Sequence, residues 1–339
     1  MALQVDKVVL EQIARLYKTP IQDLKPEGGF DNLFYSYTFD GKEFFIRIKS
    51  NINLDKRSYS QIRAEVNWIN FLAENGISVS KPQKSQHNNY VETLASNNGL
   101  YQVVSFEKAP GRYIMFSNHD EWNSDLWEKM GELVGKMHKL STMYEPENNY
   151  RRKHFEDDVF FTTEDVLDKE KDNDIIDKYA NMKRWISSLP KSHTAYGLVH
   201  SDLNWGNYYI YDKELTIFDF DSCCYNWFIY DIAILVYSLI WEKSKVKAQE
   251  FLKKFIPTFY KGYTKNYQLS REWISLMSEF LYFHDFFLYT AISETIMAGN
   301  ETEDYPSMNK IIKQRCESGI STSYFTKKEW IELFKENLV

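Results

Sequence analysis

The residues of this chain that could carry chemistry are concentrated between positions 198 and 222, in the segment LVHSDLNWGNYYIYDKELTIFDFDS. Within it, His200, Asp202, Asn207, Asp219 and Asp221 lie beside aromatic-rich runs that are typical of buried strands. Burying a carboxylate is unfavourable unless a charge or a metal ion compensates it. The segment therefore predicts a compensating group close to these acids.

Phosphoryl transfer is a reaction that needs such a set of residues. One carboxylate accepts the proton of the attacking hydroxyl, while another carboxylate and an amide oxygen hold Mg²⁺ on the nucleotide phosphates. The five-residue step from Asp202 to Asn207 can place a base and a metal ligand together, and the hairpin that follows would return Asp219 to the same metal. Mg²⁺ would then compensate the carboxylates. The alternative is a solvated turn with an accidental spacing, because short motifs also arise by chance.

The elements expected to position these residues change in type along the chain. Two strands, LFYSYTF and EFFIRIK, flank the turn dipeptide Asp40-Gly41, which is a strong hairpin signal. An amphipathic helix follows and is expected to end at Gly76, and two more strands, YVETLA and LYQVVSF, complete the first third. Beyond residue 112 the patterns are mostly helical, as at 124–140, 173–188 and 246–265, and the clear strands are YYIY and LTIF about a turn at 212–214. The sequence therefore predicts an α+β protein with a small β-rich lobe and a larger helical lobe.

Composition restricts the class of protein. The 339 residues are 43% apolar and 26% charged, as in a soluble globular protein, and the net charge of −7 argues against a nucleic-acid-binding surface. Cys223, Cys224 and Cys316 form neither a disulfide framework nor a metal-binding pair. The longest apolar run, WFIYDIAILVYSLIW, is too short to span a bilayer, and no secretory segment is evident. We expect a cytoplasmic protein without nucleic-acid or membrane partners, of undetermined oligomeric state. Its charged stretch at 144–175 is expected to be solvated, with the alternative that part of it borders a substrate cleft.

The pattern H-x-D-x-x-x-x-N, followed by D-F-D at a strand end, resembles the aminoglycoside phosphotransferase and choline kinase superfamily, which is related to protein kinases. This resemblance implies a two-lobed, protein-kinase-like fold with a nucleotide-binding lobe at 1–104, a hinge at 105–111 and a helical lobe at 112–339. It implies that Asp202 is the catalytic base and that Asn207 and Asp219 are the metal ligands. His200 resembles the histidine that supports the metal-binding turn, and Asp231 resembles the buried aspartate that binds the backbone of the catalytic loop.

The resemblance extends into the N-terminal lobe, where it implies a nucleotide site. Arg47 resembles the basic residue that binds the α- and β-phosphates, with Lys49 as the alternative on the same strand face, and Glu65 resembles its ion-pair partner. The stretch VVSFEKAPG resembles the linker that reads adenine. The remaining nucleotide-site candidates are Gly28, Gly29 and Asn32 in the phosphate loop, Phe106 as gatekeeper, and the backbone carbonyl of Glu107 and the backbone N–H of Ala109 as adenine contacts.

Two features favour a small-molecule acceptor over a protein. Ser201 stands where regulated protein kinases carry arginine, and only about ten residues separate Asp219 from the helix of Asp231, which leaves no room for a peptide-docking segment. The resemblance implies ATP, with GTP as an alternative donor, and Mg²⁺; the acceptor is an amino alcohol, a choline-like amine, a sugar or an aminoglycoside. An atypical bacterial Ser/Thr protein kinase and a non-catalytic pseudokinase are the competing classes. Candidate acceptor contacts are Asp221, Trp227, His284, Asp285 and Glu294.

Overall fold

The computed structural model describes residues 5–28, 32–51, 56–147, 149–157, 166–299 and 303–335. The chain forms two compact units. The first comprises Met1–Tyr113, Tyr144–Arg152 and Tyr209–Asp221, and the second comprises Ile114–Met143, Lys153–Tyr208 and Ser222–Val339. The first unit thus takes in 144–152 and 209–221, which the sequence had placed with the helical lobe at 112–339.

An antiparallel sheet forms the centre of the first unit. Its strands follow the order β1-β2-β3-β6-β4, and β5 pairs with β6. The bounds are β1 Lys25–Gly28, β2 Leu33–Phe39, β3 Lys42–Asn51, β4 Pro82–Gln83, β5 Glu92–Ser96 and β6 Gly99–Glu107. The predicted hairpin of β2 and β3 is confirmed: Asp40 and Gly41 have φ angles of 50° and 72°, the left-handed pair that a two-residue turn requires.

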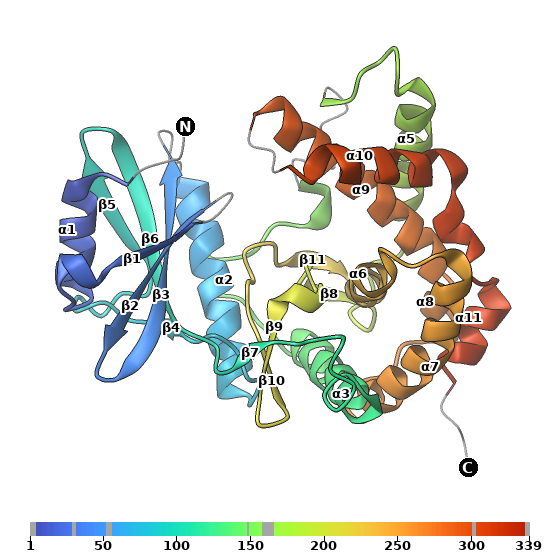
Figure 1. Cartoon of the computed structure of the whole chain (residues 1–339), viewed down its shortest axis with the longest axis horizontal. Coiled ribbons are helices and arrows are strands. Elements are labelled where there is room, and N and C mark those ends of the chain that lie inside the picture. Colours follow the sequence, from blue (N-terminus) through green and yellow to red (C-terminus); the bar gives the residue numbers. More distant parts are fainter. Residues whose placement is uncertain are drawn as a thin grey trace. The chain divides into compact units, whose positions relative to one another are not determined.

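Two helices, α1 (Lys7–Leu16) and α2 (Lys56–Glu74), cover opposite sides of this sheet (Figure 1). The alternation of the strands decides what each helix meets. Ile46 and Ile48 of β3 pack in one cluster with Val9 and Ile13 of α1. Arg47, which lies between the two isoleucines, points to the other face and pairs with α2.

A small second sheet explains why residues 209–221 belong to the first unit. Its strands are β7 Arg112–Tyr113, β9 Tyr208–Tyr211 and β10 Glu214–Ile217, in the order β10-β9-β7. Asp212 and Lys213 form the predicted turn, with φ angles of 46° and 63°. Ile217 also exchanges backbone hydrogen bonds with the segment after α2, donating to Ser78 O at 3.0 Å and accepting from Ser80 N at 3.3 Å.

The second unit is mainly helical. Its helices are α3 Ser124–Ser141, α5 Asn173–Ser187, α6 Phe228–Ile240, α7 Lys245–Tyr263, α8 Arg271–Ile274, α9 Met277–Met297, α10 Tyr305–Ser318 and α11 Lys327–Leu333. It also holds an antiparallel pair, β8 Tyr196–Val199 with β11 Cys224–Trp227. YYIY and LTIF are strands, as predicted, but the expectation that they were the only clear strands of this half was wrong. Strands β8 and β11 are short and largely buried, so they lack the alternation that reveals a half-exposed strand.

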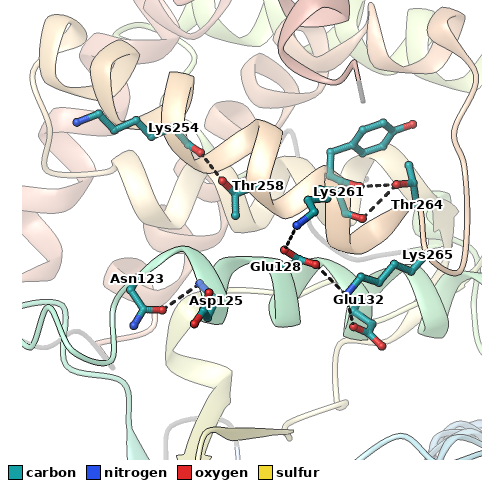
Figure 2. Close-up of polar contacts among 10 residues, drawn as sticks. Asn123, Asp125, Glu128, Glu132, Lys254, Thr258, Lys261, Thr264 and Lys265 are labelled. Atoms are coloured by element: carbon teal, nitrogen blue, oxygen red, sulfur yellow. Dashed lines mark hydrogen bonds and ion pairs between the residues drawn. The ribbon is translucent and has the colours of Figure 1, made fainter. Parts of the chain in front are cut away.

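Helices α3 and α7 cross at close range because glycines face the opposing backbone. A Cβ added at Gly131 would lie 1.8 Å from Phe259 O, and one added at Gly262 would lie 1.8 Å from Glu128 O, distances at which atoms overlap. Figure 2 shows the charged rim of this crossing, where Glu128 accepts from Lys261 at 2.7 Å and pairs with Lys265 at 2.8 Å. Backbone contact therefore fixes the distance between the helices, and the ion pairs lie outside it.

No helix within the described ranges carries an apolar stretch long enough to cross a bilayer. The apolar helix α6 is instead a buried helix, on which Asp231 is fully buried.

Candidate active site

The loop between β8 and β9 carries the central motif. All of its residues, 200–207, lie in the second unit. β8 ends at Val199, Ser201 takes a left-handed φ of 65°, and a short 3₁₀ helix at Trp205–Asn207 leads into β9. A non-glycine residue in this conformation is strained and persists only where its surroundings hold it in place.

Asp231 supplies the support for this strained turn. Its carboxylate accepts the backbone N–H of His200 at 3.0 Å and of Ser201 at 2.7 Å. On its other side, His138 Nε2 of α3 lies 3.4 Å from Asp231 Oδ2, and His138 Nδ1 lies 2.9 Å from the hydroxyl of Tyr263 of α7. The buried acid thus joins the loop to both crossing helices, which satisfies its oxygens without exposing them.

Asp202 is held in one orientation by its own loop. Asn204 Nδ2 donates to Asp202 Oδ1 and Asn207 Nδ2 donates to Asp202 Oδ2, both at 2.9 Å. His200 is fully buried, and its Nδ1 accepts the backbone N–H of Asp202 at 3.3 Å. Burial raises the pKa of Asp202, and the lowering effects of His200, Asn204 and Asn207 only partly offset it. Asp202 therefore binds a proton more readily than an ordinary aspartate does.

In the first unit, Arg47 is the centre of a buried ionic cluster. Its guanidinium donates to both oxygens of Glu65 on α2, at 2.9 and 2.7 Å, and lies 3.4 Å from Asp221 Oδ1. Asn32 Nδ2 donates to Asp221 Oδ2 at 3.0 Å. Burial alone would raise the pKa of Asp221, but the charges of Arg47, Lys49 and Arg152 outweigh burial and hold that pKa well below its usual range.

Arg152 is a member of this cluster that the sequence did not reveal. It lies in the charged stretch expected to be solvated, yet only 6% of it is exposed. It donates to the backbone carbonyl of Gln61 on α2 at 3.0 Å and to the carbonyl of Asp221. A run of charges gave no signal that one of them would be buried, so the expectation was wrong for Arg152.

A cavity of about 370 Å³ opens beside the cluster within the first unit. Of the nucleotide-site candidates, Gly28, Arg47, Glu65, Phe106 and Ala109 line it, and so does Asp219. The sequence missed its aromatic wall, which consists of Phe34, Phe45, Tyr113, Tyr209, Phe218 and Phe220. Strand alternation was an available signal for some of these side chains, because Phe45 lies two residues before Arg47 and therefore on the same face of β3.

Two other nucleotide-site candidates make contacts of their own. Asn32 is engaged with Asp221, and the side chain of Glu107, whose predicted adenine contact is the backbone carbonyl, accepts from Gln83 Nε2 at 3.0 Å. Neither is among the described residues that line the cavity. Gly29 lies outside the described residues.

Asp219 follows β10 in a strained backbone conformation. Its φ angle is 67°, a left-handed value that is uncommon for non-glycine residues, although aspartate reaches it more readily than most, and the residue is exposed. The conformation presents a carboxylate to the cavity instead of continuing the strand. Such strain is concentrated at functional sites.

A second cavity, of about 400 Å³, lies within the second unit and includes Asp202 in its wall. His284 also lines it, as predicted for an acceptor contact, but the other candidates are not among the described residues that do. Trp227 is buried, with its indole N–H on Pro190 O at 3.1 Å, and Asp285 is paired with Arg315 at 2.7 Å. Asp221 belongs to the cluster of the first unit, and Glu294 lies further along α9.

Each of the two predicted metal ligands offers an oxygen of the kind that a hard cation takes. In the second unit, Asn207 uses its amide nitrogen on Asp202, which leaves the amide oxygen for a ligand, and in the first unit Asp219 has an exposed carboxylate. Carboxylate and amide oxygens are the ligands that Mg²⁺ takes, commonly together with water and substrate phosphates. Within the part of the chain that the structure describes, no group of three or more His, Cys, Asp or Glu side chains is placed to hold a metal ion.

Comparison with known proteins gives a consistent result. Residues 24–273 of this chain match the sequence model of the phosphotransferase enzyme family. Amicoumacin kinase of Bacillus subtilis (strain 168) is 26% identical over 324 residues, which cover 94% of this chain and 94% of that protein.

Solved structures resemble the chain over almost its whole length. Amicoumacin kinase hAmiN, in complex with AMP-PNP, Ca²⁺ and Ami, superposes with a TM-score of 0.86 at 27% identity, covering 96% of this chain and 97% of that one. A microcompartment-associated aminopropanol kinase superposes with a TM-score of 0.70 at 15% identity, covering 94% and 100%, a likeness that shows the fold alone. The α+β, protein-kinase-like fold expected from the sequence is confirmed.

Proposed function

The chain belongs to the phosphotransferase enzyme family, and from this premise we propose that it transfers the γ-phosphate of ATP to a hydroxyl of a small molecule, with Asp202 as the general base. The resemblance inferred from His200, Asp202, Asn207 and Asp219 is confirmed at the level of the family, and the chain is a small-molecule phosphotransferase. The roles of single residues and the acceptor are what we propose.

The state of Asp202 is the observation that carries the proposal. A base must be oriented toward the hydroxyl and must have enough proton affinity to accept its proton. Two asparagine side chains fix the carboxylate of Asp202, and burial raises its pKa. Asp202 also lines a cavity large enough for a small molecule. A solvated turn would give a carboxylate with neither property.

We assign the nucleotide to residues of the first unit. Arg47 is preferred over Lys49 as the phosphate ligand because Arg47 lines the cavity and is oriented by Glu65. Phe106 and Ala109 line the same cavity and would receive the adenine. ATP is the proposed donor, and the cytoplasm, where ATP is abundant, is the proposed location.

Asn207 and Asp219 would hold Mg²⁺ on the phosphates of the nucleotide. When bound, the ion neutralises the charge that develops on the transferred phosphoryl group. The chain itself orients Asp202 through Asn204 and Asn207, accepts the hydroxyl proton on the Asp202 carboxylate, and positions phosphate through Arg47.

Amicoumacin is the first acceptor to assay because two relatives that cover nearly the whole chain are amicoumacin kinases. Amino alcohols, sugars and aminoglycosides are the wider acceptor classes. The assay combines purified protein with ATP, Mg²⁺ and each acceptor, and measures ADP release together with the mass of the phosphorylated acceptor.

The variant Asp202→Ala should abolish transfer while leaving ATP binding largely intact, and Asp177→Ala, an exposed acid on α5, should behave as the wild type. Normal transfer by Asp202→Ala would refute the assignment of the base. ADP release without modification of any acceptor would refute small-molecule transfer.

A further inference from the structure

The cavity that contains Asp202 has a wall made mostly of rings and aliphatic side chains. Helix α6 contributes Tyr230, Ile234 and Tyr237, and Trp241 directly follows its last residue in helical conformation; their spacing of three and four residues places these side chains on one face. Helix α9 adds Phe283, His284, Phe287 and Leu288. Such a wall offers apolar contact over most of its area, with polar groups gathered near the loop of Asp202.

The charge of this wall is small. Among the described residues that line it, Asp202 is the one carboxylate. The imidazole of His284 is neutral, since burial and the nearby Arg315 lower its pKa to about 3. Its Nδ1 shares a hydrogen bond of 3.0 Å with the hydroxyl of Tyr230, which fixes the ring. A ligand therefore meets a neutral polar group at this position and a single negative charge at Asp202.

A buried arginine already lies against two of the aromatic side chains in this wall. The guanidinium carbon of Arg315 lies 4.7 Å from the ring centre of Tyr237 and 6.0 Å from that of Trp241. Arg315 is also paired with Asp285, whose carboxylate is thereby compensated. The pair of Arg315 and Asp285 carries no net charge, so neither member adds a negative charge that would attract a second cation to these rings.

We infer that the acceptor is an alcohol on an apolar, ring-bearing body with at most one positive charge, which rests on the proposed function of Asp202. The ring packs between α6 and α9, and a single ammonium group is tolerated near Asp202. Aminoglycosides, which carry several positive charges, are poor acceptors in this cavity. Free sugars are also poor acceptors, because most of their hydroxyls would lack hydrogen-bond partners against an apolar wall. The acceptor classes proposed above are narrowed accordingly.

The test compares two acceptors that differ only in a ring. Phenylalaninol and alaninol share the same amino alcohol, and phenylalaninol adds a phenyl group. With ATP and Mg²⁺, we expect kcat/KM for phenylalaninol to exceed that for alaninol by roughly tenfold or more, as for the loss of an apolar group from a matching pocket. Kanamycin should be a poorer acceptor than phenylalaninol. Equal kcat/KM for the two amino alcohols, or a preference for kanamycin, would overturn the inference.

A matched pair of variants tests the location. Leu288→Asp adds a carboxylate to the cavity and should raise the ratio of kcat/KM for kanamycin over phenylalaninol, whereas Met297→Asp, on the same helix but 70% exposed, should leave the ratio unchanged. Equal ratios in the two variants would contradict the inference. Binding of ATP, measured in parallel, shows that each variant is folded. A wild-type protein that binds ATP but phosphorylates neither these probes nor amicoumacin would instead count against the proposed function, which separates the two failures.

Discussion

Asp202 and Asp221 show how the same side chain acquires opposite proton affinities from its surroundings. Asp202 is held by neutral amides, so burial dominates and raises its pKa. Asp221 faces Arg47, Lys49 and Arg152, whose charges outweigh burial and lower its pKa. The two side chains are the same acid, so their different pKa values come from the charges of their neighbours. These charges suit Asp202 to accept a proton and keep Asp221 as a structural anion.

The pH dependence of catalysis follows from the state of Asp202. The base must be ionised to accept a proton, so kcat/KM for the acceptor should fall as the pH drops through the pKa of Asp202, at a pH above the value of about 3.9 of an ordinary aspartate. His284 has a pKa of about 3, so its titration should cause no further change in kcat/KM between pH 5.5 and 8. The measurement is a pH profile of kcat/KM. A loss of activity that follows only the titration of an ordinary aspartate would contradict the assignment.

Asp221→Asn should destabilise the protein by about 1 to 3 kcal/mol at pH 7, less than for a fully buried pair because the Asp221 side chain is 26% exposed. The depressed pKa means that Asp221 stabilises the fold above its unfolded pKa of about 3.9, and that this stability is lost as pH falls through the lower folded pKa. Urea unfolding should therefore show the same deficit at pH 7 and pH 5.5. A deficit that grew between pH 7 and 5.5 as the pH fell would show that the linkage has the opposite sign.

Helices and strands were predictable where their signal is local. The Asp40-Gly41 hairpin, the helix that precedes Gly76 and the turn at Asp212 are encoded by adjacent residues and by simple periodicity. Strands β8 and β11 were missed because both are short and largely buried, so their side chains show no alternation between exposed and buried. Pairing of this kind is decided by the tertiary fold, which a single sequence does not display.

The same distinction holds for the candidate site. The motif residues could be found because their spacing is fixed within one loop, whereas Arg152 and the rings of Tyr113 and Tyr209 reach their places from separate segments. Asp285 was an acceptor candidate because of its type, yet its partner Arg315 lies on another helix and removes it from that role. Residue type alone does not tell a ligand-binding acid from a compensated one.

Variants at the contact between α3 and α7 test whether the packing of these helices supports the active site. Gly262→Ala would place a methyl group against the backbone of α3, and we expect a loss of about 3 kcal/mol or more in unfolding free energy, the upper end for overpacking. The neighbouring variant Lys261→Ala removes only the exposed ion pair with Glu128, which should cost less than about 1 kcal/mol. Because Tyr263 and His138 connect this crossing to Asp231, Gly262→Ala should also lower kcat. Chemical denaturation and steady-state rates measure both effects, and equal stability of the two variants would contradict the packing argument.

At the scale of the whole molecule, the proposed reaction draws on both units. Asp202 and Asn207 belong to the second unit, while Arg47, Glu65 and Asp219 belong to the first. A nucleotide with its metal ion that binds only the folded protein stabilises it by mass action, by about 2.7 kcal/mol at a concentration of one hundred times Kd. ATP with Mg²⁺ should therefore raise Tm more than ATP with EDTA does.

Asp219→Asn should remove most of the rise in Tm that depends on Mg²⁺, because an amide is a weaker metal ligand than a carboxylate. The rise in Tm due to ATP alone should remain, because Arg47 and Glu65 stay in place. Glu303→Gln, a change at an exposed acid of the second unit, is the matched control. Thermal unfolding of the three proteins gives the comparison. An unchanged Mg²⁺ increment in Asp219→Asn would remove Asp219 from the metal site.

The most direct test of the role of Asp202 is a single-turnover measurement on Asp202→Asn, which preserves the shape of the side chain and removes its ability to accept a proton. Excess enzyme would be mixed with ATP, Mg²⁺ and an acceptor that the wild type phosphorylates, and ATP affinity would be measured on the same samples. We predict that phosphoryl transfer slows by a factor of 10² or more while ATP binds with nearly wild-type affinity. Transfer at the wild-type rate would contradict the account, because the hydroxyl proton would then leave by another route.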